Sequence, residues 1–264
     1  IMLKLSISIV IPVYNSEKIL PNLIESIIFY LNKDFSGLKY EIILINDFSS
    51  DKSWEIITEL SKKLENLKGI NLSENCGQHN AIMAGLNIAS GEKIITMDDD
   101  FQHHPSNLIF FFNKLDHCDA CYTYYKNRKH NFWKKKCSQL NNLISSFLLD
   151  KPIHIYMSSF RGLNQKVLIE IIKYKEKNVY LDYLILKNAN TVEMINVEHH
   201  VRLEGNSNYS LKKLLILWSS MVLCADVLPL RFKSFFILFF KLMAKLIVRN
   251  EKKNEQFKIL GKTF

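Results

Sequence analysis

The chain has 264 residues and a formal net charge of +9, with 48% hydrophobic and 23% charged residues. This is ordinary globular usage, and it excludes an intrinsically disordered chain. Only 8 glycines and 5 prolines are present, which excludes collagen-like and simple low-complexity sequences. The length fits one large domain, or one domain with an appendage.

Strands and helices are predicted to alternate along the first hundred residues. Apolar, β-rich runs predict strands at residues 5–11, 40–45, 69–72 and 93–97. Periodic apolar positions predict helices at residues 18–31, 51–64 and 78–89. This order is typical of right-handed β-α-β crossovers and a mostly parallel sheet. Ligands bind beyond the carboxyl ends of such strands, so polar residues 12–15, 46–49 and 98–100 are predicted to share one rim.

The second half of the chain has weaker patterns. Strands are expected at residues 120–125 and 191–197, and helices at 132–149, 164–174 and 211–223. Up to Glu204 there are 24 Lys/Arg and 23 Asp/Glu, a net of +1; from Gly205 onward there are 11 and 3, a net of +8. The excess positive charge of the tail indicates an anionic partner surface.

The very apolar segment 230–248 is interrupted by four basic residues, Arg231, Lys233, Lys241 and Lys245. Charges are costly inside a bilayer, so we expect residues 211–264 to form basic amphipathic helices that lie in a membrane interface. The alternative is an interface between copies of the chain in a homo-oligomer. Nucleic acid is not expected as a partner, because the basic residues are interleaved with Leu, Ile and Phe.

Five cysteines are present. The odd number, together with a first apolar run too short for a secretory signal, leads us to expect reduced thiols in a cytosolic setting. Cys118 and Cys121 form one C-x-x-C, but no second ligand pair lies at a spacing suited to zinc, so buried structural thiols are expected.

Asp98 and Asp100 follow the predicted strand at 93–97. Residues two apart in an extended chain point to the same side, so both carboxylates are expected to face one point while Asp99 faces away. Two such charges repel unless a cation neutralises them, and hard oxygen ligands suit Mg²⁺ or Mn²⁺. The alternative is a solvated acidic turn.

Several motifs, in order, resemble one known family. Residues 8–17 (SIVIPVYNSE) are similar to the opening of family 2 glycosyltransferases with the GT-A fold. Residues 46–53 (NDFSSDKS) resemble their second-strand motif, D-D-G-S-x-D-x-S. Residues 97–105 (MDDDFQHHP) and 202–210 (RLEGNSNYS) are similar to the D-x-D-[LF]-Q-x-x-P and R-x-x-G-x-S-K-Y-S motifs of the polyprenyl-phosphate sugar transferases, a subgroup that includes dolichol-phosphate mannosyltransferase.

The resemblance implies a metal-dependent, inverting transferase with a UDP- or GDP-sugar donor. It implies that the nucleotide-sugar pocket is lined by Pro12, Tyr14, Glu17, Asp47, Asp98 and Ser207, with Asp47 on the base. It further implies that Asp98, Asp100 and Gln102 surround the cation and that Arg202, with Ser207, closes over the phosphates. Arg128 and Arg161 are the candidates for the acceptor phosphate. Arg suits phosphate by its planar fork.

Four positions depart from the family pattern: Asn46, Phe48, His104 and Asn208. They replace, in that order, the first acid and the glycine of the second-strand motif, a proline after the D-x-D, and the lysine of the closing loop. These changes affect the base-binding and loop motifs, whereas both carboxylates of the D-x-D are present.

The predicted organisation is a GT-A catalytic domain at 1–210, with a nucleotide-binding half at about 1–104 and an acceptor half at about 105–210. The resemblance implies a polyprenyl-phosphate acceptor at the cytoplasmic membrane face. Such an acceptor needs no general base, because a phosphate monoester is already ionised and nucleophilic near neutral pH. The alternative acceptor is a sugar hydroxyl of a lipid-linked saccharide, which needs a general base, and Asp182 is the candidate. A further alternative is that the protein is not an enzyme but a non-catalytic module that binds a nucleotide or another anion.

Overall fold

The computed structural model describes residues 6–35, 37–125, 141–147, 149–197 and 256–264. Three of the predicted site residues, Arg128, Arg202 and Ser207, lie outside these ranges. The predicted helices at 211–223 and within 230–248 lie outside them as well.

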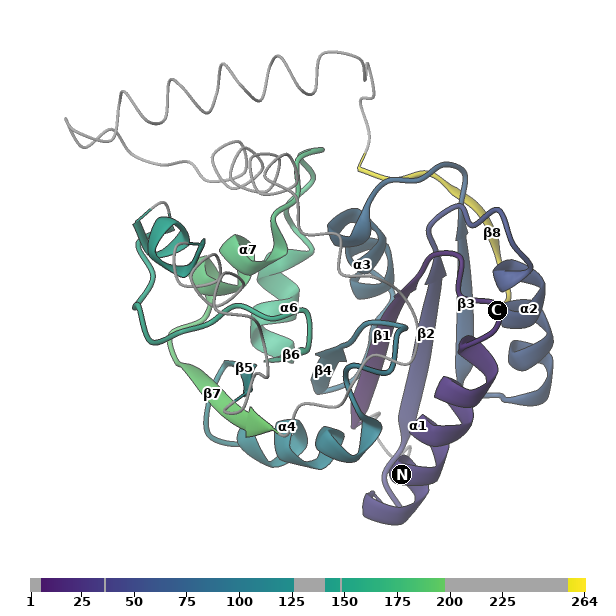
Figure 1. Cartoon of the computed structure of the whole chain (residues 1–264), viewed down its shortest axis with the longest axis horizontal. Helices are drawn as coiled ribbons and strands as arrows, with labels where there is room; N and C mark the ends of the chain where they lie inside the picture. The colour runs from purple at the N-terminus through teal and green to yellow at the C-terminus, as the bar shows by residue number, and fades with distance from the viewer. Residues whose placement is uncertain (1–5, 36, 126–140, 148, 198–255) are drawn as a thin grey trace, which may run out of the picture.

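One mixed sheet organises the described part of the chain (Figure 1). Its strands are β1 (Ile7–Val13), β2 (Tyr40–Asn46), β3 (Leu67–Leu72), β4 (Lys93–Thr96), β5 (Ala120–Tyr125), β6 (Arg161–Asn164), β7 (Val192–Val197) and β8 (Ile259–Lys262). The helices are α1 (Leu20–Asp34), α2 (Ser53–Lys63), α3 (Gln78–Leu86), α4 (Leu108–Lys114), α6 (Gln165–Ile171) and α7 (Leu181–Asn188). Residues 141–147 are also helical, and η1 (Pro105–Asn107) is a single 3-10 turn.

The strand order is β7-β5-β6-β4-β1-β2-β3-β8. The first four strands are parallel, as predicted, and so are β5 and β7. Strand β6 was not predicted; it runs antiparallel between β4 and β5 and joins the two halves of the sheet. Its four residues are too few to show an alternating pattern, so local sequence gives no strand signal there.

The prediction that residues 211–264 are helical is wrong at the end of the chain, where residues 259–262 form a strand. Strand β8, yellow in Figure 1, pairs antiparallel with β3 at the sheet edge. Thr263 fixes this strand, because its hydroxyl accepts from the amide of Gly69 at 2.8 Å and its own amide donates to the Gly69 carbonyl at 3.1 Å. An unpaired strand edge offers a row of backbone donors and acceptors, and these pair with a short segment whatever its side-chain pattern.

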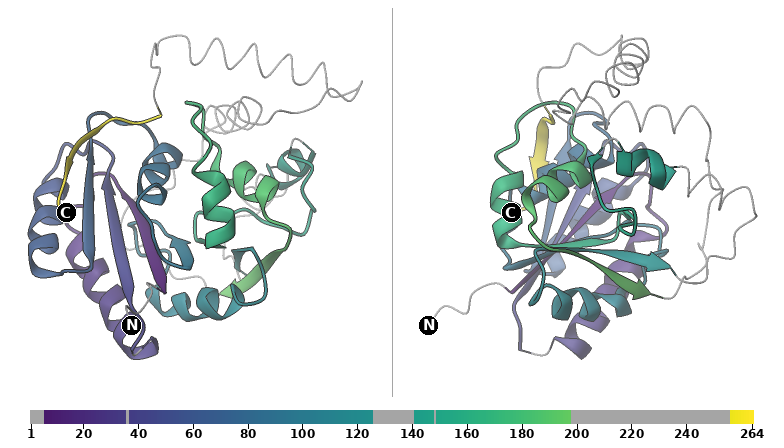
Figure 2. Two further views of the ribbon diagram at one scale, coloured as in Figure 1. Left: turned by 180° about the vertical axis from the view of Figure 1, so that it is seen from behind. Right: turned by 90° about the vertical axis from the view of Figure 1, so that its left-hand side faces the viewer.

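Helices cover both faces of the sheet (Figure 2). Helices α1, α2 and α4 pack on one face, and α3, α6 and α7 pack on the other. Gly85 brings α3 close to the sheet, because a Cβ at this position would lie 2.6 Å from Cγ1 of Val10 and 2.7 Å from Cδ1 of Ile45. This close packing fixes the last turn of α3 against β1 and β2.

Three cysteines lie in the described part of the chain. Cys118 and Cys121 are buried and Cys76 is partly buried, and no disulfide joins these three. Cys121 lies in β5 against Gly162 of β6, as expected for a structural thiol.

A buried carboxylate ties β1, β2 and β3 together at the end of the sheet opposite the rim. Glu41 accepts hydrogen bonds from Ser8 Oγ at 2.6 Å, from the amide of Ser90 at 2.8 Å and from Lys68 Nζ at 2.6 Å. Burial raises the pKa of Glu41, but the bonds from Lys68, Ser8 and Ser90 outweigh burial and leave the pKa below its usual 4.5.

Glu41→Gln is expected to lower the free energy of unfolding by about 1 to 3 kcal/mol at neutral pH, because it removes a charged acceptor from a buried network. A lowered pKa contributes stability that is present above 4.5 and is lost as the pH falls through the native value. Urea unfolding across this acid range should therefore show the two proteins converging in acid. A gap that stays constant down to the lowest pH would contradict this account.

Candidate active site

The loops that follow β1 and β2 interlock through side-chain bonds to backbone amides. Asn15 Oδ1 accepts from the amide of Ser50 at 2.8 Å. The amide of Glu17 donates to Asp51 Oδ2 at 3.0 Å, and Glu17 Oε2 accepts from the amide of Lys52 at 2.9 Å. Glu17, predicted to line a nucleotide pocket, therefore also fixes the start of α2. The rim predicted from the strand ends is a rigid pair of loops.

Three residues in the loops that follow β1, β2 and β4 have a positive backbone φ, which residues other than glycine rarely adopt. Asn15, Phe48 and Phe101 have φ of 54°, 59° and 59°. Such conformations store strain and gather at functional sites. They turn two aromatic rings outward, since Tyr14 and Phe48 are each 54% exposed. An exposed aromatic pair beside polar loops offers flat apolar surface to a planar ligand.

Asp47 lies at the end of β2 and is 4% exposed. Its Oδ1 accepts from the amide of Cys76 at 2.7 Å and its Oδ2 from the amide of Gly77 at 3.0 Å, immediately before α3. Burial raises the pKa of Asp47, against the two amide bonds that lower it. The residue predicted to contact the base thus also holds the loop that precedes α3.

Asp98 connects three elements at the carboxyl end of β4. Its Oδ1 accepts from Gln78 Nε2 of α3 at 2.6 Å, and its Oδ2 accepts from Ser159 Oγ, just before β6, at 2.6 Å. Its amide donates to Nδ1 of His103, a buried ring stacked on Phe160. The carboxylate is partly exposed and is held from both sides, so its position is fixed before any ligand binds.

The expectation that Asp99 faces away from the site is wrong. Asp99 Oδ2 accepts from Ser16 Oγ at 2.5 Å and from the amide of Tyr14 at 3.2 Å, both in the loop after β1. Strand β4 ends at Thr96, so the alternation of side chains along a strand no longer applies at residues 98–100. Burial raises the pKa of Asp99 to about 6. The middle acid of the three therefore joins β4 to the loop after β1, a role that no local pattern indicates.

The oxygen donors at residues 98–102 fit a divalent cation. Asp98 and Asp100 supply carboxylates and Gln102 supplies an amide oxygen, the hard ligands that Mg²⁺ and Mn²⁺ take. Asp100 Oδ1 also accepts from the amide of Gln102 at 3.1 Å, which closes this turn. Within the described ranges no group of three or more His, Cys, Asp or Glu could hold a metal. A cation here would therefore complete its shell with oxygens of a bound ligand and water.

A buried ion pair lies beyond this rim. Arg161 of β6 is 2% exposed, and its guanidinium binds the carboxylate of Asp182 in the first turn of α7, which is 6% exposed. Asp182, the candidate base for a hydroxyl acceptor, thus lies buried at the start of a helix. Arg161, predicted to meet an acceptor phosphate, has its charge committed to Asp182.

Two further polar groups surround this pair. Nδ1 of His79 accepts from the amide of Leu181 at 3.4 Å, and the ring lies edge-on to Tyr180. Burial lowers the pKa of His79 to about 4, so the ring is neutral near pH 7. Burial, then the charge of Asp182, raises the pKa of Tyr122 well above its usual value. His79 connects α3 to α7, whereas Tyr122 lies in β5, and no local sequence pattern indicated either residue.

The structure thus gathers Tyr14, Asp47, Asp98 and the turn at 100–102 at one rim, with Glu17 beneath it. Pro12 is buried within β1, behind this rim. Across residues 8–172 the sequence matches the family described as Glycosyl transferase family 2. The chain belongs to this family. The expectation that it is a glycosyltransferase is therefore confirmed.

Curated relatives carry the same name in several organisms. Undecaprenyl-phosphate 4-deoxy-4-formamido-L-arabinose transferase of Edwardsiella ictaluri is 32% identical over 87% of this chain and 71% of its own length. The proteins of that name in Photorhabdus laumondii and Salmonella paratyphi B are 32% and 33% identical, over 86% of this chain and 70% of theirs. These relatives are polyprenyl-phosphate sugar transferases by name, so the resemblance seen in the sequence motifs is confirmed.

Solved structures share the fold of this glycosyltransferase. S. aureus TarS in complex with UDP-GlcNAc aligns with a TM-score of 0.54 at 22% identity, covering 92% of this chain and 73% of TarS. Glucosyl-3-phosphoglycerate synthase from Mycobacterium tuberculosis, in complex with Mn²⁺, UDP and phosphoglyceric acid, aligns with a TM-score of 0.59 at 15% identity, covering 85% and 80%. The expected GT-A-type α/β fold is confirmed. No helix in the described ranges has the length and apolar character that a bilayer crossing needs.

Proposed function

We propose that this glycosyltransferase moves a sugar from a nucleotide-sugar donor to a polyprenyl phosphate, with inversion at the sugar carbon. The relatives named undecaprenyl-phosphate transferases, which match 86–87% of the chain, support the acceptor. The observation that carries the proposal is the buried pair of Arg161 and Asp182. In this pair the carboxylate of Asp182, which a hydroxyl acceptor would need as a base, is already bound to the guanidinium of Arg161.

The residues at the rim are proposed to bind the nucleotide-sugar donor. Tyr14 and Phe48 present exposed rings for the base, and Asp47, held by two amides, leaves its remaining lone pairs for a base N–H. Asp98, Asp100 and Gln102 would hold Mg²⁺ or Mn²⁺ on the donor diphosphate, where the cation neutralises the charge of the leaving group. Gln78 and Ser159 keep Asp98 in position for this ligand. Arg202 and Ser207 are proposed to close over the same phosphates.

The acceptor side needs no proton transfer in this proposal. A phosphate monoester is largely ionised near neutral pH, so one of its oxygens attacks the sugar carbon as the bond to the diphosphate breaks. If Asp182 acted as a base, its protonation would leave the buried guanidinium of Arg161 without a counter-charge, which is costly. Arg161 is thus proposed to position Asp182, and Arg128 is the remaining candidate for the acceptor phosphate.

The proposed place of action is the cytoplasmic face of the membrane, where a nucleotide sugar and a lipid phosphate meet. The tail from residue 211 carries the basic and apolar residues that suit an anionic lipid surface. This peripheral attachment is a proposal, as is the possibility that the tail pairs two copies of the chain.

The direct test incubates the purified full-length chain with undecaprenyl phosphate, Mg²⁺ or Mn²⁺ and a panel of UDP- and GDP-sugars. Mass spectrometry of the lipid fraction is expected to detect a prenyl-phosphate monosaccharide with one donor of the panel. Reactions without donor, or with chelator, are the controls. If only a lipid-linked disaccharide forms when lipid-linked sugars are supplied, the acceptor is a hydroxyl and Asp182 becomes the candidate base. No turnover of any donor would favour a silent binding module.

A further inference from the structure

A buried lysine fixes the turn at residues 150–155 against the helix at 141–147. Lys151 is 6% exposed, and its Nζ donates to Asn142 Oδ1 at 2.7 Å, to Ser146 Oγ at 3.0 Å and to the Ile155 carbonyl at 2.6 Å. Asn142 Nδ2 also donates to the carbonyl of Ile153 at 2.7 Å. An ammonium has three protons, and all three are used. Helix and turn are therefore one rigid unit.

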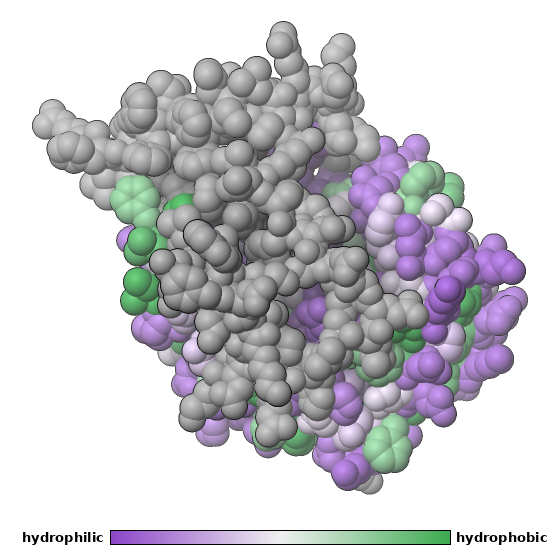
Figure 3. All heavy atoms as spheres, in the orientation of Figure 1, coloured by the Kyte–Doolittle hydropathy of each residue, from purple (hydrophilic) through white to green (hydrophobic). Residues whose placement is uncertain are grey.

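This rigid unit presents three large apolar side chains to the outside. Leu143 and Phe147, four residues apart on one helix face, are 56% and 48% exposed, and Ile153 of the adjoining turn is 60% exposed. We call these three residues the apolar knob. Figure 3 shows hydrophobic side chains gathered at the left edge of the molecule, in the region where Figure 1 places this helix and turn. Exposed apolar surface of this kind marks a membrane or ligand contact.

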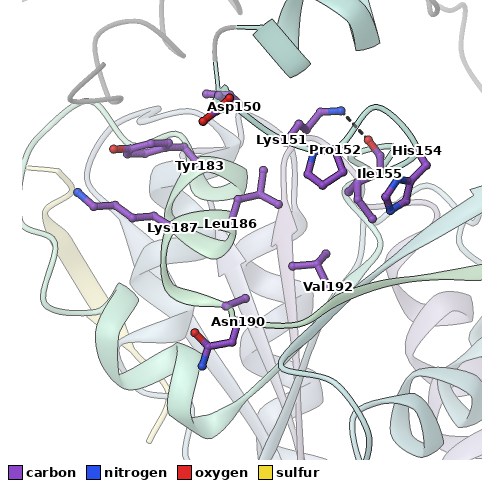
Figure 4. A pocket seen from close by; sticks show the side chains of 12 residues that line it. Asp150, Lys151, Pro152, His154, Ile155, Tyr183, Leu186, Lys187, Asn190 and Val192 are labelled. Carbon is purple, nitrogen blue, oxygen red and sulfur yellow. Dashed lines mark hydrogen bonds between the residues drawn. The ribbon is translucent and has the colours of Figure 1, made fainter. Parts of the chain in front are cut away.

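An open pocket of about 460 Å³ lies between α7 and the turn that carries Ile153 of the knob (Figure 4). The turn supplies one wall and α7 with the start of β7 supplies the other. The apolar part of its lining is formed by Leu149, Pro152, Ile155, Leu186, Ala189 and Val192. The ring of Tyr183 flanks this lining, and the basic side chains of Lys187 and His154 lie at its edge. Asp150, Lys151 and Asn190 also line the pocket. The volume is in the range of small-molecule sites, and the apolar part of the lining suits a hydrocarbon.

We propose that the apolar knob and this pocket bind the isoprenoid chain of the lipid acceptor. This inference rests on the proposed function, because a polyprenyl phosphate is the acceptor there. Burial of hydrocarbon against apolar side chains is favourable in proportion to the area buried, and the exposed knob offers further apolar surface beside the turn that lines the pocket. Lys187 and His154 suit the anionic phosphates of the lipid surface at the point of entry.

Helix α7 joins this pocket to the site of sugar transfer. Its first turn holds Asp182 on the side of Arg161, and Tyr183 and Leu186 face the pocket. A chain seated in the pocket would therefore run along α7 toward the rim, so that its phosphate end lies near the donor. The site selects for the length and apolar character of the acceptor tail and makes no contact with the reacting atoms.

The test compares a long and a short acceptor on the same enzyme. The triple variant Leu143→Ser, Phe147→Ser and Ile153→Ser removes the knob without touching the core, because all three side chains are exposed. For undecaprenyl phosphate in mixed micelles, KM is expected to rise about tenfold or more with kcat nearly unchanged, since buried apolar contact is lost. For geranyl phosphate, which is too short to span the pocket and the knob together, KM is expected to stay within about twofold.

A matched control replaces three exposed apolar residues by Ser on helices outside the knob. Phe29, Phe110 and Ile169 are 60%, 52% and 48% exposed on α1, α4 and α6, and their triple replacement by Ser should leave both KM values unchanged. As a second probe, Ala189→Trp fills the pocket and is expected to weaken the long acceptor alone. A photoreactive prenyl phosphate should label peptides from residues 149–155 or 183–192.

The outcomes separate this proposal from the proposed function. If the unaltered enzyme transfers sugar to both lipid phosphates but the knob variant treats them alike, the acceptor assignment stands and the isoprenoid site is wrong. Labelling confined to other peptides, or a change of oligomeric state in the knob variant with unchanged KM, overturns it too. If the unaltered enzyme uses neither lipid, the proposed function itself fails.

Discussion

Asp98→Asn is expected to lower the rate of sugar transfer by about 10²- to 10³-fold, because a neutral amide cannot balance a cation on the leaving diphosphate. The side chain keeps its shape and one oxygen, so the contacts with Gln78 and Ser159 are disturbed little. The measurement is kcat at saturating donor and acceptor. Chelation of divalent cations should lower the rate of the unaltered enzyme similarly, and added Mn²⁺ should restore it.

Asp116→Asn is the matched control for this change. Asp116 is an exposed carboxylate that pairs at 2.7 Å with Lys93, at the start of β4 and so at the opposite end of this strand from the rim. Its replacement should leave kcat unchanged within error. An Asp98→Asn enzyme that still turns over at nearly the normal rate, with the same dependence on Mn²⁺, would remove this carboxylate from the proposed chemistry.

Asp182→Ala is expected to lower the free energy of unfolding by about 3 to 5 kcal/mol, because it leaves the buried guanidinium of Arg161 without a partner. Denaturant unfolding followed by circular dichroism measures this. The double variant Arg161→Met with Asp182→Leu should recover most of the loss, since it removes both charges and keeps the volume. Glu170→Ala breaks a surface pair with Lys173 and should cost no more than about 1 kcal/mol. A similar small cost for Asp182→Ala would contradict the role of the pair.

The same position also separates the two acceptor classes. Asp182→Asn keeps the side-chain shape, so it is the variant for activity, once its melting curve shows that it is folded. Transfer to a polyprenyl phosphate is expected at a nearly normal kcat for the folded fraction. A base for a hydroxyl acceptor contributes about 10²- to 10⁴-fold, so a loss of that size in a well-folded Asp182→Asn enzyme would favour the alternative.

Much of the sheet was predictable from sequence because its signals are local. The strand predicted at 40–45 is β2, Tyr40–Asn46, and the strand predicted at 120–125 is β5. Apolar runs bounded by turn residues are enough to find such elements. The rim followed from them, because parallel strands bring their carboxyl ends together. The contacts between the loops after β1 and β2 bear this out.

The parts that were missed depend on distant partners. Strand β6 is a strand because β4 and β5 lie on either side of it, and β8 is one because the edge of β3 is open. Arg161 is buried because Asp182, 21 residues along the chain, neutralises it. The residues that neighbour Arg161 and Asp182 in the sequence form no pattern that predicts this ion pair. The contact of Asp99 with Ser16, 83 residues away, is of the same kind.

Strand β8 closes one edge of the sheet. Strand β7 ends at Val197 on one outer edge, and β8 begins at Ile259 beside β3 on the opposite edge. Because β8 pairs antiparallel with β3, the backbone donors and acceptors on that side of β3 are taken up within the chain. A protein shortened before residue 256 would lack β8 and leave the edge of β3 open to self-association.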